Sequence, residues 1–164
     1  MANREELAII RNARAGQAAA QLALGKLYLF GSAGLPQSLP TALHWLERAA
    51  RQDCQQAWQL IGDHIPLELA QGSGQALAPW YERAYDDGSV HAGLVFAQLV
   101  LDTIDTGAAP GPQHGKAQRA LEDAARAGFP AAQWLLARRR ELAAAPARQA
   151  RVDGAAPSSG RPAA

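Results

Sequence analysis

Small and apolar residues recur along most of the chain at a spacing of about 34 to 40 residues. The segment 45–49 (WLERA) returns 35 residues later as segment 80–84 (WYERA). Ala20 has counterparts at three later positions, with successive shifts of 37, 35 and 40 residues: Ala57, Ala92 and Ala132. Such self-similarity predicts an array of helical repeats, in which each unit buries its apolar face against its neighbours.

Four corresponding turns separate the helices that this pattern predicts: 14–16, 51–53, 86–88 and 126–128. Three of them end in glycine, which suits the positive φ of a residue just past a helix end. The fourth ends in Asp53, a residue type that tolerates this conformation better than most. The turns and the apolar periodicity predict eight helices, near 3–15, 18–30, 39–52, 54–65, 75–87, 89–104, 115–127 and 130–144.

Three longer connections, 31–40, 66–74 and 105–115, fall at the same phase of the repeat. We therefore expect them to emerge on one edge of the array. Residues 146–164 are rich in proline, glycine and alanine and have no helical periodicity, so they predict a disordered tail. The expected organisation is a repeat domain over residues 1–145 followed by that tail.

One repeat carries a recognisable motif, Ala-x3-Leu-Gly-x2-Tyr, then a glycine-containing loop, then Ala-x2-Trp-x3-Ala-Ala. Its residues are Ala20, Leu24, Gly25, Tyr28, Gly31, Gly34, Leu35, Ala42, Trp45, Ala49 and Ala50. This motif resembles the Sel-1-like repeat, a relative of the tetratricopeptide repeat. With two more degenerate units the resemblance covers about residues 18–128. It implies an all-α fold, a right-handed α-solenoid of antiparallel helix pairs with about eight helices.

Two glycines of the motif lie in the middle of predicted helices. Gly25 and Gly62 each cost a helix about 1 kcal/mol relative to alanine, so another role must compensate for that cost. We expect close helix–helix approach, with the glycines facing small residues such as Ala49 or Ala84. Tyr28 and Trp45 would then fill the space between layers.

Composition favours the same fold class. The chain has 164 residues, of which 38 are alanine, the best helix former. The net charge is only +1, but residues 138–164 hold six arginines against two acidic residues. The one cysteine cannot form an intramolecular disulfide, and no run approaches the length of a spanning helix. We expect a soluble cytoplasmic protein without membrane insertion.

The candidate chemistry is sparse. His44, His64, His91 and His114 show no zinc-ligand spacing, and the acidic pairs show no calcium-loop spacing. No histidine or carboxylate lies at a spacing from Cys54 that would mark it as a catalytic nucleophile. Neither a phosphate-binding loop nor a Ser-x-x-Lys motif is present. The sequence therefore predicts no metal, no cofactor and no enzymatic activity.

A row of side chains points away from the core stripe of each first helix, that is, the first of the two helices in every repeat. If these helices line the inner wall, as the resemblance implies, the row forms a mixed apolar and polar groove for a peptide or helix. The alternative is that its apolar members pack between first helices and bind nothing. The predicted groove residues are Leu22, Lys26, Leu29, Gln59, Asp63, Leu94, Gln98, Leu101, Trp134 and Arg138.

The function that these observations predict is a non-catalytic scaffold or adaptor that binds a protein or peptide partner. The alternative is a regulatory or nucleic-acid-associated factor that uses the arginine-rich C-terminal segment, with an enzyme ranked third. Nucleic acid ranks below protein as a partner, because a polar, charged terminal helix is also what an array needs at its end. Homodimerisation through the end helices is left open.

Overall fold

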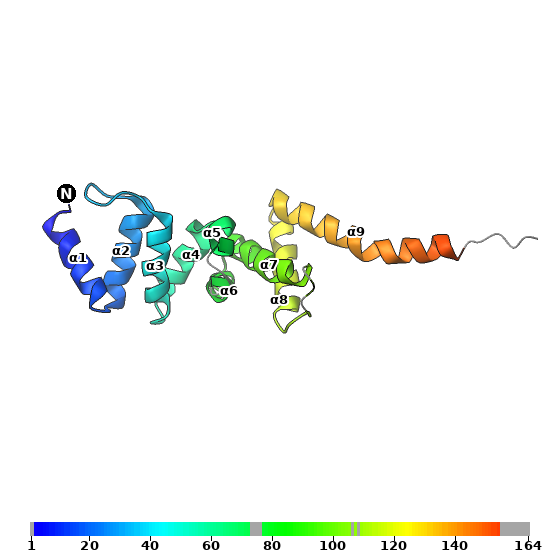
Figure 1. Cartoon of the computed structure of the whole chain (residues 1–164), viewed down its shortest axis with the longest axis horizontal. Coiled ribbons are helices and arrows are strands. Elements are labelled where there is room, and N and C mark those ends of the chain that lie inside the picture. The colour runs from blue at the N-terminus through cyan, green and yellow to red at the C-terminus, as the bar shows by residue number, and fades with distance from the viewer. Residues whose placement is uncertain (1, 73–76, 106, 108, 155–164) are drawn as a thin grey trace, which may run out of the picture.

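The computed structural model describes residues 2–72, 77–105, 107 and 109–154, and within these ranges it contains helices and no strand. Figure 1 shows the helices stacked along one long axis. The helices are α1 Arg4–Arg14, α2 Ala18–Phe30, α3 Leu39–Ala50, α4 Gln55–His64, α5 Leu67–Gly72, α6 Ala78–Asp86, α7 Val90–Asp105, α8 His114–Arg126 and α9 Pro130–Asp153.

The array consists of antiparallel helix pairs, in agreement with the predicted all-α solenoid. The pairs are α2 with α3, α4 with α6, and α7 with α8, and each helix also packs on the next pair. Helix α1 contacts α2 at one end, and α9 contacts α8 at the other. The first helices of the three pairs are therefore α2, α4 and α7, and α9 follows in the same phase.

The four predicted turns have the same backbone geometry. Their last residues, Gly16, Asp53, Gly88 and Gly128, all have positive φ, between 61° and 105°. After each one, the next backbone N–H donates to the carbonyl five residues earlier, as in a Schellman motif. This common turn reverses the chain in the same way each time, so successive first helices start at equivalent positions.

The glycines Gly25 and Gly62 lie at close helix–helix contacts, as predicted, although the neighbour of Gly25 differs from the one expected. A Cβ on Gly62 would lie 2.6 Å from the Cβ of Ala84 and 2.8 Å from that of Ala92. A Cβ on Gly25 would instead lie 2.7 Å from the Leu46 side chain, so the expected small residue Ala49 is not its neighbour. Helix α4 thus approaches α6 and α7 through small residues on both sides.

Two elements differ from the sequence prediction. Residues 67–72, expected within a connection, form the short helix α5, whose Leu67 and Leu69 pack against the main core. Helix α9 does not end near residue 144 but continues to Asp153, through Pro146. The described residues 146–152 are exposed, and the part of the predicted disordered tail from residue 155 onward lies outside the described residues.

The N-terminal helix is attached through a buried carboxylate. The carboxylate of Glu6 accepts hydrogen bonds from the Ser32 hydroxyl, 2.6 Å away, and from the backbone N–H of Asn3, 2.9 Å away. These two bonds, the Ser32 bond first, lower the pKa of Glu6. Because Ser32 lies in the connection after α2, Glu6 links α1 to the first complete pair.

Candidate functional site

Seven of the ten predicted groove residues are at least partly accessible on successive first helices. We call them the first-helix row, and they are Leu22 and Lys26 on α2, Gln59 and Asp63 on α4, Gln98 on α7, and Trp134 and Arg138 on α9. Lys26, Asp63, Trp134 and Arg138 are exposed, and the other three are half-buried. The row therefore offers two apolar, two amide and three charged side chains to solvent.

The other three predicted groove residues belong to the core. Leu29 is 2% exposed, Leu94 6% and Leu101 4%, and all three lie in the main hydrophobic cluster. The prediction that they line an open groove is wrong. Helix α5 explains part of this burial, because it packs on α7, and its Gln71 donates a hydrogen bond to Asp102, next to Leu101.

Contacts between neighbouring first helices join the row into one surface. Helix α2 contacts α4, and α4 contacts α7. The Ser89 hydroxyl, just before α7, donates to the Asp63 carboxylate over 2.8 Å. The ring of His91 on α7 lies 6.2 Å from that of Phe129, the residue that precedes α9. The first helices therefore contact one another from α2 to α7, and the His91–Phe129 contact brings the start of α9 close to α7.

Trp134 and Arg138 form the end of the row. The Trp134 side chain is 59% exposed, and the guanidinium of Arg138 lies 5.2 Å from its ring centroid. This cation–π contact holds the indole against the helix surface while one face of it remains accessible. Exposed tryptophan held in one orientation is typical of a residue that anchors a protein partner.

Sequence reasoning missed two aromatic neighbours of the row. Phe30 is 60% exposed, and its ring meets that of His64 edge-on at a centroid distance of 5.3 Å. Phe30 follows Lys26 by four residues and so lies beside it on α2, and its ring contact places His64 of α4 next to Phe30. The i,i+4 rule applied to Lys26 would have found Phe30, which extends the apolar part of the row at α2.

A second aromatic and charged cluster joins α4 to α6. The indoles of Trp58 and Trp80 are nearly parallel, with centroids 6.4 Å apart, and the Arg83 guanidinium lies 5.0 Å from the first and 5.2 Å from the second. The indole N–H of Trp58 donates to Asp87 over 2.8 Å, which lowers the pKa of that carboxyl group. These groups bind one another across two helices, so we interpret the cluster as packing between repeats.

The histidines lie apart and have separate neighbours. His44 contacts the Trp45 ring, His64 contacts Phe30, and the Nδ1 of His91 lies 3.0 Å from the Gly62 carbonyl oxygen. No group of three or more histidine, cysteine or acidic residues within the described part of the chain could hold a metal ion. Among the described helices, none combines the length and the apolar character needed to cross a bilayer.

Comparison with known families identifies the repeat. Residues 18–54, which comprise α2, α3 and the turn that follows them, match the family model described as Sel1 repeat. This segment contains every residue of the motif on which the sequence resemblance rests. A search of curated proteins gives no match at the significance required.

Two solved structures are similar to the chain. One is a Sel1 repeat protein from Oxalobacter formigenes, with 29% sequence identity and a TM-score of 0.46. The match covers 82% of this chain and 98% of that one. The other is c5321, a protective antigen present in uropathogenic Escherichia coli strains that displays an SLR fold. Its sequence identity is 22% and its TM-score is 0.48, and the match covers 76% of this chain and 26% of that one. Both TM-scores lie below 0.5, so the fold assignment rests on the helices described above and on the repeat match.

Proposed function

We propose that this chain, a Sel1-repeat protein through its residues 18–54, is a non-catalytic adaptor that holds a peptide or helix of a partner protein along the first-helix row. Sel1 repeats generally serve as scaffolds for protein–protein interaction. The array is long relative to its width, as Figure 1 shows, and each repeat adds another first helix to the same surface.

The observation that carries the proposal is the chemical make-up of the row on adjoining helices. Trp134 and Phe30 supply exposed apolar surface near its two ends, at 59% and 60% exposure. Lys26, one turn before Phe30 on α2, and Asp63 on α4 supply opposite charges, each exposed. Apolar anchors separated by charged and amide groups suit a partner helix with one apolar face and charged flanks.

Charge reversal on the row tests the proposal. The array would be used to capture partners from its native host, as the unmodified chain and as the double variant Lys26→Glu, Asp63→Lys. Both side chains are exposed, and the double variant keeps the net charge. Asp63→Lys loses the exposed hydrogen bond from Ser89, but no buried contact changes, so the helical content should be unchanged. Arg48→Glu on α3 is the control, because it changes an exposed charge on a second helix.

The proposal predicts that the double variant loses the captured partner, while Arg48→Glu retains it. Circular dichroism should show the same helical signal for all three proteins. Retention of the partner by the double variant, or its loss from the Arg48→Glu protein alone, would contradict binding along the first helices.

A further inference from the structure

The later half of α9 projects from the array. Figure 1 shows that α9 extends past α8 along the long axis, with no other described helix beside its later half. Every side chain from Ala145 to Val152 is exposed. A helical segment of this length gains little stability by itself in water, so a second helix packed against it would stabilise it.

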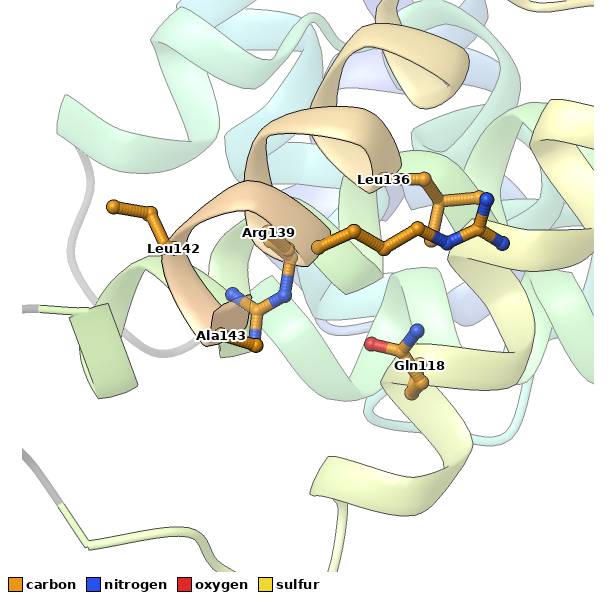
Figure 2. Close-up of a pocket in the computed structure, with 6 residues that line it drawn as sticks. Gln118, Leu136, Arg139, Leu142 and Ala143 are labelled. Carbon is orange, nitrogen blue, oxygen red and sulfur yellow. The ribbon is translucent and has the colours of Figure 1, made fainter. Parts of the chain in front are cut away.

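One exposed stripe runs along α9. Its residues are Trp134, Arg138, Leu142, Ala145, Gln149 and Val152, all exposed. At 100° per residue they span only about 80° of the helix surface, and from Arg138 onward they alternate by four and three positions, as in a coiled-coil seam. Figure 2 shows that Leu142 points away from Gln118 of α8, so the stripe lies on a side of α9 that α8 leaves uncovered.

The stripe gathers the exposed large apolar residues of this end of the array. Trp134 and Leu142 are each 59% exposed, and Val152 is 71% exposed. Glu141 and Arg148 lie on one common edge of the stripe, and both are exposed. Neither forms an ion pair with another residue that the structure describes. The stripe is therefore an apolar seam with an unpaired acid and an unpaired base beside it.

We infer that α9 pairs along this stripe with α9 of a second copy of the chain, in antiparallel orientation. The two-fold axis passes between residues 143 and 144, so Leu142 lies against Ala145 of the second copy. The same axis places Trp134 against Val152 of the second copy. Arg138 meets Gln149 of the second copy, whose amide oxygen can accept a hydrogen bond from the guanidinium. Each contact occurs twice in the dimer.

The charges beside the stripe favour the antiparallel orientation. In an antiparallel pair the same edge of both helices meets, so Glu141 lies beside Arg148 of the second copy, offset by about 3 Å along the axis. On the other edge Arg139 lies nearest to Pro146 of the second copy, which carries no charge. A parallel pair in register would instead place Arg138 against Arg138 of the second copy within the seam, where like charges repel.

This self-association goes beyond the proposed function, and it shares Trp134 and Arg138 with the first-helix row. A partner bound along the whole row displaces the second copy from these two residues. Lys26 and Asp63 lie on α2 and α4, outside the paired helices, and remain accessible in the dimer. The charge-reversal test at Lys26 and Asp63 therefore stands whether or not the chain forms this dimer.

Sedimentation equilibrium of the full chain, from low micromolar to several hundred micromolar, tests the inference. Arg148→Glu and Glu141→Arg each place like charges at both edge contacts, and the double variant restores opposite charges with their positions exchanged. Leu142→Asp puts a charge into the seam at a position that is exposed in the single chain. Arg140→Glu is the matched control for Arg148→Glu, because it makes the same charge change at an exposed position of α9 away from the stripe.

The inference predicts a reversible monomer–dimer equilibrium for the unmodified chain. Each single edge variant should weaken dimerisation about tenfold, since two symmetric contacts change from attraction to repulsion. The double variant should return to within about threefold of the unmodified chain. Leu142→Asp should be monomeric at every concentration, and Arg140→Glu should stay within about twofold, as expected for a change in overall charge. Circular dichroism should show that all variants remain helical arrays.

Other results would overturn the inference. These are a monomeric unmodified chain at every concentration, a double variant that associates no better than the single ones, or equal weakening by Arg140→Glu and Arg148→Glu. Assemblies larger than a dimer would mean that copies meet through other surfaces. A monomeric chain whose captured protein partner is lost on Leu142→Asp would assign the stripe to that partner instead of to a second copy.

Discussion

Replacing Gly62 with alanine tests the close approach of α4 to its two neighbours. A new Cβ would stand 2.6 Å from the Cβ of Ala84 and 2.8 Å from that of Ala92. Neither neighbour has a flexible end that can move aside, so the helices themselves must shift. Overpacking of this kind costs about 1–3 kcal/mol. The added methyl also favours the helix by about 0.5–1 kcal/mol.

Gly115 provides the matched control for this substitution. It lies in the first turn of α8, and a Cβ there would meet nothing within 4 Å. Gly115→Ala should therefore gain helix stability without a clash, by about 0.5–1 kcal/mol. Because both variants gain helix stability from the change of glycine to alanine, this gain largely cancels when their stabilities are compared. We therefore expect Gly62→Ala to be about 1–3 kcal/mol less stable than Gly115→Ala.

Urea unfolding followed by far-ultraviolet circular dichroism measures this difference. The unmodified chain and both variants would be compared in one buffer, with the slopes checked for equality. If Gly62→Ala proves as stable as Gly115→Ala, the small-residue contact between α4, α6 and α7 is not what the structure shows.

Three further outcomes are expected. The lowered pKa of Glu6 means that its bond to Ser32 stabilises the fold above pH 4.5, and that this contribution is lost as the pH falls through the lowered pKa. Unfolding measured across pH should therefore show that Glu6→Gln is less stable than the unmodified chain near neutral pH and equally stable in acid. A stability difference that does not change with pH would contradict this. Tyr85→Phe removes a hydrogen bond to Asp123 and should cost about 1 kcal/mol in urea unfolding, whereas no change would mean that the bond is absent in solution. Leu94→Ala should lower the free energy of unfolding by about 2–5 kcal/mol, and a decrease of less than about 1 kcal/mol would mean that the Leu94 side chain is not buried.

The sequence predicted the repeat architecture because its strongest signals are local and recurrent. The four turns ending at Gly16, Asp53, Gly88 and Gly128 were identified from residue type alone, and all have the positive φ that this type indicates. Of the nine helices in the described residues, seven were predicted close to their observed bounds, and α9 was predicted at its start but not at its end. Helix α5 was missed because six residues are too few to show a helical period.

The predicted groove was less accurate because a helical wheel defines only one helix. It places Leu94 and Leu101 on a side of α7 away from the core stripe, but it does not say which other element covers that side. Here α5, absent from the prediction, packs on α7. The end of α9 was misplaced because residues 146–164 were assigned to a tail from their proline, glycine and alanine content and their lack of periodicity. Helix α9 nevertheless continues through Pro146, which removes a single backbone hydrogen bond within a run of alanines that strongly favours helix.

Site-specific photo-crosslinking tests the central claim most directly. A photoreactive amino acid would replace Lys26, Asp63 or Trp134 on the first-helix row, and Arg48 or Arg119 on second helices, all of which are exposed. After capture of the partner in its native host, the account predicts crosslinks from the three row positions and none from Arg48 or Arg119. Crosslinks from the second-helix positions alone would contradict binding along the first helices.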